Sequence, residues 1–397
     1  MKMRVGLLND TFPPTIDGVA ITTKNYADCL ERLGCDPTVI APKYPKVADN
    51  YKYEVYRYAS VPLEKFIGYR AGAPFSPLVI SQLRSRKFHL LHTHCPFASS
   101  VMARNITLSE SERVPVVLTY HTKFDIDLAK RVKMKKFLPF ATKFVRYNIS
   151  MADEVWVVSE GTVQSLRLMG YEGDYQVMRN GTDFTRGKAS PERIAAAEQK
   201  YGIRPGVPLL YFIGRMMWYK NTRLILDGLN MLKERGIPFQ AMFIGDGTDA
   251  PEVKAYSSGL RLDDQVTFTG AIHDREELRA IASRAELLLF PSSYDTSGLV
   301  VIEAAACDCP AILVRGSCAA EGVTDNETGF LCEETAQDFA ETLQMALSDP
   351  AHLKKVAEQA GKAIYLSWEQ SVARAYARYE EILYAWKYKD PERAYYK

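Results

Sequence analysis

Long apolar runs and an excess of one charge sign are both missing from this 397-residue chain. No apolar run reaches 18 residues, so we expect no helix that spans a membrane. Lys and Arg number 50 against 48 Asp and Glu, a net charge of +2, which argues against a strongly basic nucleic-acid-binding protein. Met1 to Arg4 lead directly into an apolar run, so we expect no signal peptide and a cytoplasmic location.

The cysteines form neither a metal-binding pattern nor a disulfide pattern. They number seven, which is an odd set. Cys307 and Cys309 stand too close together for a zinc knuckle, and no second pair follows at ligand spacing. We therefore expect reduced, structural cysteines and no metal site.

The loop after the first expected strand lacks the Gly-x-Gly-x-x-Gly fingerprint of dinucleotide-binding folds. The strand is expected at Arg4–Asn9, and the loop that follows reads DTFPPTIDG and ends at Gly18. A helix from about Val19 to Leu33 comes next. These features disfavour an NAD-dependent oxidoreductase.

Apolar strands and amphipathic helices alternate along the chain in two successive runs. The length and the 47% hydrophobic content fit two globular domains. Residues 179–208 are rich in Gly, Pro and charge, and we place the linker at about 183–205. We predict an α/β protein with two Rossmann-like, doubly wound domains, residues 1–183 and 205–369, which face each other across a cleft. A final helix at about 370–397 is expected to cross back to the first domain.

Two carboxylates, Asp295 and Glu303, stand eight residues apart in YDTSGLVVIEAAACDCP. The preceding run Ala285–Phe290 is apolar, so the expected order is buried strand, short polar loop and helix. Open α/β sheets bind ligands at such strand ends, and the N–H groups that open the helix can hold a phosphate. These N–H groups belong to Ser297, Gly298, Leu299 and Val300. A nucleotide-sugar offers hydroxyls to both carboxylates; the alternative is a surface Asp and a satisfied helix Glu.

A second expected strand ends in Arg215, and Lys220 follows five residues later. A planar guanidinium fork beside an ammonium point charge suits a diphosphate. The alternative is a pair of solvated surface cations.

These spacings resemble the carboxylate-x7-Glu and Gly-Arg-x4-Lys motifs of retaining GT-B glycosyltransferases, in particular glycosyltransferase family 4. The resemblance covers most of the chain. It implies that Arg215 and Lys220 contact the donor diphosphate and stabilise the departing nucleotide. It also implies that Glu303 holds the ribose hydroxyls and that Asp295 touches the 3- and 4-hydroxyls of the transferred sugar.

Three positions depart from the family pattern. Asp295 stands where the family usually has Glu, and its shorter side chain leaves the donor sugar open. Tyr219 replaces a Glu that often precedes the Lys, and Asp308 replaces a Gly. Asp tolerates a left-handed turn, so the turn at 308 can survive.

Further positions gain a role only from the resemblance. Gly245 matches a turn that lines the nucleotide pocket, and the backbone of Ala271 and Ile272 would read the base. Gly18 matches a small-residue loop that approaches phosphate, and His121 matches a strand-end histidine near the 6-hydroxyl of the reacting sugar. A structural turn or a structural histidine is the alternative at each place.

Two more histidines, His92 and His94, share one face of an expected strand. We interpret them as structural or as lining the acceptor side.

Residues 130–147 carry seven Lys and Arg and no acidic residue. At helical spacing one face would hold Met134, Phe137, Leu138, Ala141, Phe144 and Val145. Lys135, Lys136, Lys143 and Arg146 would lie roughly opposite, and Pro139 would kink or split the helix. Such a segment suits an anionic membrane surface; an ordinary core-facing helix with a solvated basic side is the alternative.

Taken with the basic segment, the resemblance points to the subgroup that glucosylates diacylglycerol. It implies a retaining, metal-independent hexosyltransferase without a cofactor, which moves glucose from UDP-glucose to a lipid hydroxyl at the inner face of the cell membrane. A polysaccharide or small glycosyl acceptor, a non-hydrolysing nucleotide-sugar epimerase and an inactive sugar- or membrane-binding module remain as alternatives. The base, the linkage and the oligomeric state stay open.

Overall fold

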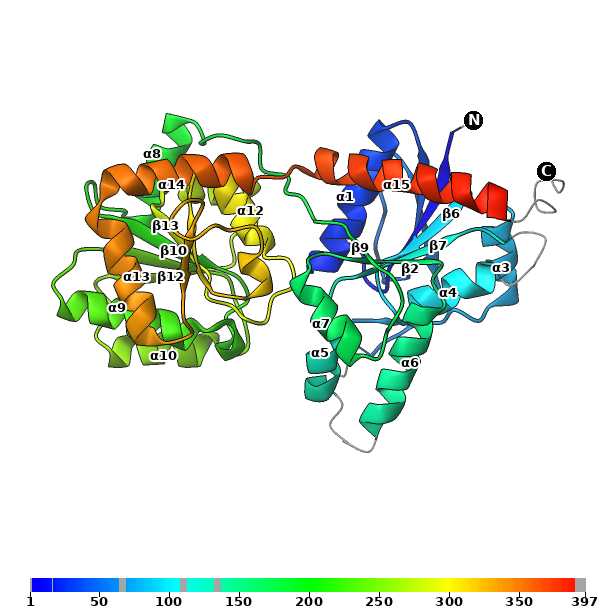
Figure 1. The fold of residues 1–397 in the computed structure, drawn as a ribbon, viewed down its shortest axis with the longest axis horizontal. Helices are drawn as coiled ribbons and strands as arrows, with labels where there is room; N and C mark the ends of the chain where they lie inside the picture. Colours follow the sequence, from blue (N-terminus) through cyan, green and yellow to red (C-terminus); the bar gives the residue numbers. More distant parts are fainter. Residues whose placement is uncertain (1, 16, 64–68, 108–112, 132–136, 390–397) are drawn as a thin grey trace. The chain divides into compact units, whose positions relative to one another are not determined.

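The computed structural model describes residues 2–15, 17–63, 69–107, 113–131 and 137–389 (Figure 1). It divides into two compact units. The first unit comprises Met1–Asn180 and Trp368–Lys397, and the second unit comprises Gly181–Ser367.

The first unit is built on a seven-stranded sheet in the order β3-β2-β1-β6-β7-β8-β9, with every neighbouring pair parallel. Its strands are β1 (Arg4–Leu8), β2 (Asp36–Pro42), β3 (Glu54–Tyr58), β6 (Leu90–Thr93), β7 (Val116–Tyr120), β8 (Glu154–Val157) and β9 (Gln176–Val177). A short antiparallel pair, β4 (Ser60–Val61) and β5 (Ala71–Gly72), lies apart from this sheet. Helices α1 (Gly18–Arg32), α3 (Pro77–Arg84), α4 (Ala98–Thr107), α5 (Phe124–Arg131), α6 (Leu138–Ser150) and α7 (Gly161–Leu168) connect the strands. All of β7 is buried, as a parallel strand covered on both faces requires.

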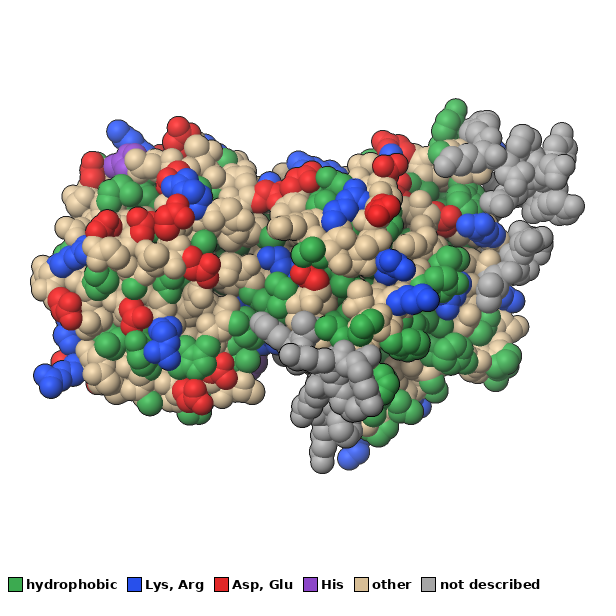
Figure 2. All heavy atoms as spheres, turned by 60° about the horizontal axis from the view of Figure 1, so that its bottom comes forward, with side chains coloured by type: hydrophobic (Ala, Val, Ile, Leu, Met, Phe, Trp, Pro, Cys, Tyr) green, Lys and Arg blue, Asp and Glu red, His purple; other side chains and the backbone are tan. Residues whose placement is uncertain are grey.

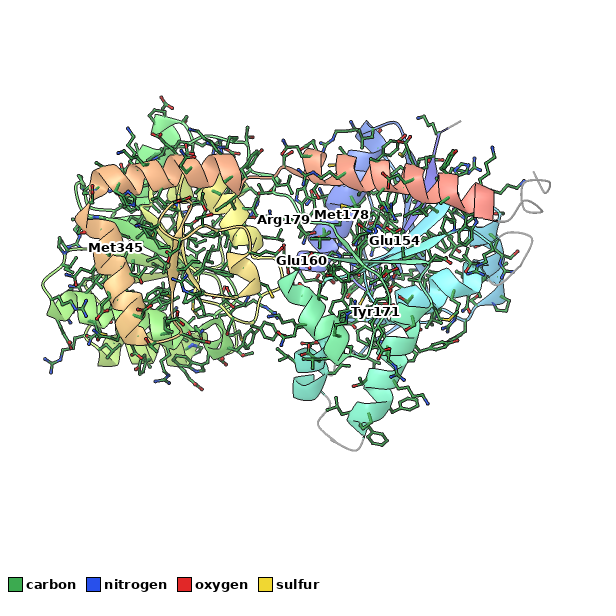
Figure 3. All side chains as sticks on the ribbon, in the orientation of Figure 1. Glu154, Glu160, Tyr171, Met178, Arg179 and Met345 are labelled. Atoms are coloured by element: carbon green, nitrogen blue, oxygen red, sulfur yellow. The ribbon has the colours of Figure 1, made fainter. Side chains whose placement is uncertain are left out.

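The C-terminal helix α15 (Trp368–Lys389) belongs to the first unit and contacts α1 (Figure 1). Arg378 donates two hydrogen bonds to Glu154, which is labelled in Figure 3, at 2.9 and 2.7 Å. Arg32 of α1 pairs with Glu369 at 2.8 Å. Apolar packing and paired charges therefore hold this helix on the first unit.

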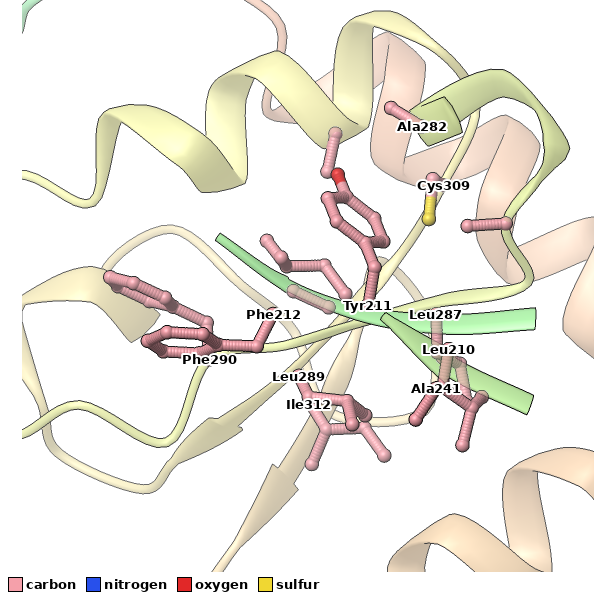
Figure 4. Close-up of a cluster of buried hydrophobic side chains, with 14 of the residues drawn as sticks. Leu210, Tyr211, Phe212, Ala241, Ala282, Leu287, Leu289, Phe290, Cys309 and Ile312 are labelled. Atoms are coloured by element: carbon pink, nitrogen blue, oxygen red, sulfur yellow. The ribbon is translucent and has the colours of Figure 1, made fainter. Parts of the chain in front are cut away.

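The second unit is built on a six-stranded parallel sheet in the order β12-β11-β10-β13-β14-β15. Its strands are β10 (Leu209–Ile213), β11 (Gln240–Ile244), β12 (Val266–Gly270), β13 (Leu287–Leu289), β14 (Ala311–Val314) and β15 (Phe330–Cys332). Its helices are α8 (Pro191–Tyr201), α9 (Thr222–Glu234), α10 (Ala250–Gly259), α11 (Arg275–Arg284), α12 (Leu299–Ala306), α13 (Ala336–Ser348) and α14 (Pro350–Ala363), with short 3-10 turns η3 (Trp218–Lys220) and η4 (Cys318–Ala320). In the core, Tyr211 lies with Cys309 on one face of the sheet, and Leu289 with Ile312 lies on the other (Figure 4).

The linker predicted at 183–205 is wrong, because α8 lies there and belongs to the second unit. Ser190 caps this helix at its start, and Gly202 ends it in the left-handed conformation at φ 64°. Glu198 pairs with Arg284 of α11 at 2.6 Å. Pro191 and Gly202, which suggested a linker, are boundary signals of this helix, and the chain passes from the first unit to the second after Asn180.

The predicted apolar face of residues 130–147 divides into two faces on α6, and residues 132–136, including Met134, lie outside the described part of the chain. Leu138, Ala141 and Val145 pack against the core of the first unit. Solvent-exposed apolar side chains form a separate row at helical spacing, called here the exposed stripe: Phe137, Phe140, Phe144, Tyr147 and Met151. Figure 2 shows hydrophobic side chains gathered on this face. Among the described helices, none is long and apolar enough to cross a membrane.

Candidate active site

Four neighbouring strands of the second unit end beside one another and carry most of the predicted site residues. Arg215 and Lys220 follow β10, Gly245 follows β11 and Ile272 follows β12, while Asp295 follows β13. These strands stand next to one another in the sheet order β12-β11-β10-β13. Their carboxyl ends therefore form one continuous edge, which is where open parallel sheets bind ligands.

The loops that follow β10 and β11 pack backbone against backbone. Gly245 has a φ of +125°, and a Cβ added there would lie 2.0 Å from the carbonyl oxygen of Gly214. A Cβ on Gly247 would lie 2.3 Å from the carbonyl oxygen of Met216. Neither position can carry a side chain without moving the loops apart. The packing explains both glycines, and the role of Gly245 in lining a nucleotide pocket stays a prediction.

Lys220 and Asp295 form an ion pair across the ends of β10 and β13. Lys220 is 7% exposed, and its Nζ donates to Asp295 Oδ2 at 2.6 Å and also to Oδ1. Asn221 holds the two loops together, because its Nδ2 donates to the Pro291 carbonyl at 2.8 Å. The sequence assigned Lys220 and Asp295 to different parts of a ligand, and the structure brings them into direct contact.

Arg215 lies at the same edge with its side chain exposed. Within the described ranges of the chain, its guanidinium makes no hydrogen bond or ion pair with another residue. Arg215 is therefore placed to meet an anion from solvent, and Lys220 is held in a buried pair.

Glu303 lies on α12 and contacts Arg275, the first residue of α11. Arg275 Nη2 lies 2.6 Å from Glu303 Oε1, and its Nε donates to Asp183 Oδ2 at 3.0 Å. The guanidinium carbon stands 4.4 Å from the ring centroid of Phe184. Burial raises the pKa of the Glu303 carboxyl, and the Arg275 charge acts in the opposite direction. The Glu303 side chain is 15% exposed, and a cation that also pairs with Asp183 holds its carboxyl.

Sequence reasoning missed Arg275 and Asp183. They are 92 residues apart, and Arg275 is 28 residues from Glu303, so no local spacing connects them. One signal in the sequence could have indicated the pair. Arg275 is a cation at the first position of a helix, which is unfavourable unless an anion lies beside it.

The N-terminus of α12 follows directly after the Asp295 loop. Gly298 precedes the helix with φ +56°, and a Cβ there would lie 2.9 Å from Ala319 Cβ. Gly298 at the N-cap position provides no side-chain cap, and the first turn of α12 holds no acidic residue. The amides of Leu299 and Val300 therefore open the helix without a carboxylate on them, and Ser297 stands half-buried before them. Such a helix end favours anions.

One amide of the predicted base-reading pair is already engaged within the protein. The Ala271 N–H donates to Asp246 Oδ2 at 3.0 Å, so that amide is engaged within the protein. Ile272 is half-buried and packs against the core of the second unit. The backbone of Ile272 and the carbonyl of Ala271 stay candidates for the base.

In the first unit, Gly18 begins α1 and is exposed, and a Cβ there would meet no atom within 4 Å. The Asp17 carboxylate accepts from the N–H groups of Val19 at 2.9 Å and Ala20 at 2.8 Å. A carboxylate therefore already occupies the first turn where a phosphate was expected. A close approach of phosphate at Gly18 stays a prediction.

His121 follows β7 and is 8% exposed. Its Nε2 lies 3.0 Å from His94 Nδ1. Burial lowers the pKa of His121 to about 3, so the ring is neutral at pH 7. His92 Nδ1 lies 2.6 Å from Tyr379 Oη, and its Nε2 lies 2.7 Å from Thr119 Oγ1. His92 is thus a structural residue that joins the sheet to α15.

Among the described residues, no group of three His, Cys, Asp or Glu side chains could hold a metal ion.

Comparisons with known proteins cover both units. Residues 16–186 match the family model described as Glycosyltransferase Family 4, and residues 194–363 match the one described as Glycosyl transferases group 1. Alpha-monoglucosyldiacylglycerol synthase of Streptococcus pneumoniae is 25% identical over 315 residues, which are 78% of this chain and 70% of that protein.

Solved structures resemble the whole chain in fold. Sucrose-phosphate synthase from Thermosynechococcus elongatus has a TM-score of 0.80 at 20% identity and covers 97% of this chain and 100% of its own. The Anabaena protein HepE in complex with UDP and glucose has a TM-score of 0.73 at 18% identity, with coverages of 95% and 99%.

Proposed function

Because the chain is a glycosyltransferase of family 4 with the GT-B fold, we propose that it moves glucose from UDP-glucose to a hydroxyl of a membrane lipid such as diacylglycerol, with retention at the anomeric carbon. The observation that carries the donor part is the meeting of Arg215, the Lys220–Asp295 pair and the uncapped N-terminus of α12 at one sheet edge. The name of the S. pneumoniae relative supports the lipid acceptor.

The charges at this edge match the parts of a nucleotide-sugar. Arg215 and the first amides of α12 would hold the diphosphate, because both present positive charge toward solvent. The second oxygen of Glu303 would accept a ribose hydroxyl, since Arg275 occupies the first. Asp295 would accept hydroxyls of the transferred sugar while its ion pair with Lys220 keeps the carboxylate oriented.

Transfer then proceeds by positioning and charge stabilisation. The acceptor oxygen forms a bond to the anomeric carbon on the face from which the phosphate leaves. The bond from that carbon to the phosphate oxygen breaks, the electron pair leaves with UDP, and the acceptor proton passes to the departing phosphate. Arg215, Lys220 and the helix amides stabilise the charge that develops there. Since these groups supply positive charge, we propose that no metal is required, and we expect activity to persist in EDTA.

The exposed stripe on α6 supports the membrane part of the proposal. Its five apolar side chains are each at least 39% exposed, with Phe140 at 74%. Lys143 and Arg146 of the same helix are also exposed. Aromatic side chains beside cations bind the interface of anionic bilayers. The stripe would hold the first unit at the surface where a lipid acceptor resides.

Nucleotide binding is the test of the donor site. Thermal unfolding is followed with UDP, GDP, ADP and NAD, for the natural chain and for Glu303→Ala. That variant leaves Arg275 paired with Asp183, so we expect it to fold. UDP at 100 times its Kd should stabilise the natural chain by about 2.7 kcal/mol, with little effect on Glu303→Ala. A folded chain that responds to no nucleoside diphosphate would contradict the proposal.

Vesicle flotation tests the membrane surface. The natural chain should float with vesicles that contain phosphatidylglycerol and remain unbound with neutral phosphatidylcholine vesicles. Replacing Phe140 and Phe144 by Ser should abolish flotation. The matched control is Met345→Ser on α13, labelled in Figure 3, an exposed apolar residue of the second unit. Equal binding by both variants would contradict a role for the stripe.

A further inference from the structure

A small pocket opens on the surface of the first unit, between helices α3 and α4. Its volume is about 390 Å³, and it is called here the α3–α4 pocket. This volume lies at the low end of the range for ligand pockets, so it suits a molecule of headgroup size. Apolar and polar side chains line it together: Phe75, Pro77, Ile80, Ser81, Arg84 and Asn105.

Arg84 presents a fixed cation in this pocket. Its Nε donates to the Ile106 carbonyl at 2.9 Å, and its Nη2 donates to the Asn105 carbonyl at 2.7 Å. Both carbonyls lie in the last turn of α4, where helical partners are missing, so these bonds hold the guanidinium in place and bring no anion to it. Its third nitrogen, Nη1, makes no hydrogen bond with any residue that the structure describes.

Arg86, two residues further along the chain, provides the contrast. It pairs with the Glu54 carboxylate through Nε at 2.8 Å and through Nη2. Arg84 has no carboxylate partner of this kind within the described ranges of the chain. A fixed arginine fork without an anion is suited to bind a phosphate group.

Apolar side chains at the edge of the pocket distinguish the kind of phosphate that fits. Phe75 is 72% exposed, and Leu78, on the first turn of α3, is 68% exposed. Asn105 Nδ2 donates to the Pro74 carbonyl at 2.9 Å, so the segment that carries Phe75 is fixed to α4. An anion site bordered by exposed apolar surface fits an amphiphile better than a free phosphate ion.

Helix α4 joins this pocket to the exposed stripe on α6. It packs against α3 on one side and contacts α6 on the other. Arg104, next to Asn105 on α4, places its guanidinium carbon 5.1 Å from the ring centroid of Tyr147, a member of the stripe. Figure 2 shows Lys and Arg side chains among the hydrophobic ones on the first unit. The pocket therefore belongs to the same surface as the stripe.

Positive charge and exposed apolar side chains both concentrate in the first unit. By sequence this unit carries 31 Lys and Arg against 22 Asp and Glu, a net charge of +9, whereas the second unit carries 19 against 26, a net charge of −7. Among the described residues, the large apolar side chains that are exposed all lie in the first unit except Met345. This combination favours an anionic lipid surface as the partner of the first unit.

We propose that the α3–α4 pocket binds the phosphate group of one anionic phospholipid of the membrane. Arg84 donates to the phosphate oxygens, and Phe75, Pro77 and Ile80 lie against the glycerol and the first acyl carbons. The proposal rests on the membrane part of the proposed function, and it gives the first unit a lipid site besides the exposed stripe. Sugar transfer to this lipid is no part of it.

Calorimetric titration with short-chain lipids below their critical micelle concentration tests the pocket without vesicles. Dihexanoylphosphatidylglycerol should bind the full chain at one site. Dihexanoylphosphatidylcholine should bind at least about tenfold more weakly, because its choline cation opposes Arg84. Inorganic phosphate should also bind at least about tenfold more weakly, since it has no apolar part. Equal affinity for any two of these ligands, or no binding of the phosphatidylglycerol, would overturn the proposal.

Two substitutions remove the site in different ways. Arg84→Gln removes the cation, and Ser81→Trp fills the pocket and leaves the guanidinium with its carbonyl partners. Each should weaken phosphatidylglycerol binding by about tenfold or more. The matched controls are Arg86→Gln and Ser85→Trp, at the end of α3 and outside the pocket lining. Natural affinity in Ser81→Trp, or an equal loss in the controls, would contradict the proposal.

Two further measurements separate this site from the others. The variant with Phe140 and Phe144 replaced by Ser should bind the soluble lipid like the natural chain, and a loss there would place the lipid on the exposed stripe and overturn the proposal. UDP should stabilise Arg84→Gln and Ser81→Trp as it does the natural chain. A chain that binds UDP without the lipid contradicts the pocket alone, whereas a chain that binds the lipid without any nucleoside diphosphate contradicts the proposed function alone.

Discussion

Lys220 Nζ lies 2.6 Å from Asp295 Oδ2, so the cation expected on the donor diphosphate and the carboxylate expected on the donor sugar form one ion pair. The pair joins the loops after β10 and β13, which are neighbours in the sheet. Tyr219 and Tyr294, one residue before each partner, also contact each other, with ring centroids 4.6 Å apart. The pair therefore sets the position of Asp295 before any ligand binds.

Breaking the pair should cost both stability and activity. Lys220→Met leaves the Asp295 carboxylate, 23% exposed, without its cation, and we expect unfolding to become easier by about 1–3 kcal/mol. Sugar transfer should fall by about 10²–10³-fold because a charge that stabilises the leaving group is gone. Urea unfolding and initial rates measure the two effects.

The double variant Lys220→Met with Asp295→Asn separates these effects. Removing both charges should recover most of the lost stability, since no unpaired charge remains. It should not recover activity. A double variant that regains both would mean that the pair is structural only.

Arg275→Gln should weaken nucleotide binding through Glu303. Without the guanidinium, burial acts unopposed and the pKa of Glu303 rises further. We expect the Kd for UDP to increase about tenfold, equivalent to about 1.4 kcal/mol, and more at pH 6 than at pH 8, because the carboxyl is protonated more at the lower pH. Calorimetric titration measures this. The control is Arg235→Gln, which changes an exposed residue whose guanidinium contacts Gln344. An equal loss of UDP affinity in both variants would contradict the role of Arg275 and Glu303 in nucleotide binding.

Gly298→Ala should disturb the N-terminus of α12. The new Cβ would stand 2.9 Å from Ala319 Cβ at a φ of +56°, where a side chain costs about 1–2 kcal/mol. Gly259→Ala is the matched control, because its Cβ would meet no atom within 4 Å and its φ is ordinary. That change should leave stability equal or raise it by about 0.4–1 kcal/mol. Thermal unfolding that ranks the two variants in the opposite order would contradict the geometry.

The stability of the first unit should depend on pH through its buried histidines. The pKa of His121 falls from 6.5 to about 3 on folding, so the unfolded chain binds more protons between these values. The stability that the neutral ring contributes is complete above pH 6.5 and is lost as the pH falls toward 3. The slope is at most about 1.4 kcal/mol per pH unit for one group. Urea titrations between pH 6.5 and 4 should show a shallower slope for His121→Gln.

The Asp10 carboxyl changes the stability with pH in the opposite direction, and it is present in both the natural chain and the His121→Gln variant. Burial raises its pKa from 3.8 to about 6, so its contribution is present below pH 3.8 and is lost as the pH rises through 6. Taking the difference between the natural chain and His121→Gln removes that contribution. Parallel slopes for the two proteins would contradict a buried, neutral His121.

The sequence correctly predicted the elements that depend on local residue patterns. The largely apolar run Ala285–Phe290 predicted a buried parallel strand, and the buried strand β13, the loop and the helix around Asp295 lie where the pattern put them. The linker predicted at 183–205 was wrong for a local reason. Ser and Gly, which stand at the start and end of α8 as Ser190 and Gly202, are also common in linkers.

Long-range contacts could not be predicted in the same way. Asp183 and Arg275 meet only after the second unit folds, and the Asp246 carboxylate engages the Ala271 amide for the same reason. On α6, the sequence placed Phe144 and Val145 on one apolar face. Packing buries Val145 and leaves Phe144 exposed, because the core covers only part of that face.

Proton NMR of the reaction product tests the central claim most directly. The chain is incubated with UDP-glucose and dioleoylglycerol in vesicles that contain phosphatidylglycerol, and the lipid product is analysed at its anomeric proton. We predict release of UDP and an α-glucoside, identified by the small coupling between its first two ring protons. A β-glucoside would contradict retention. Consumption of UDP-glucose without acceptor would indicate an epimerase, and no turnover of any nucleotide-sugar by the folded chain would contradict the account as a whole.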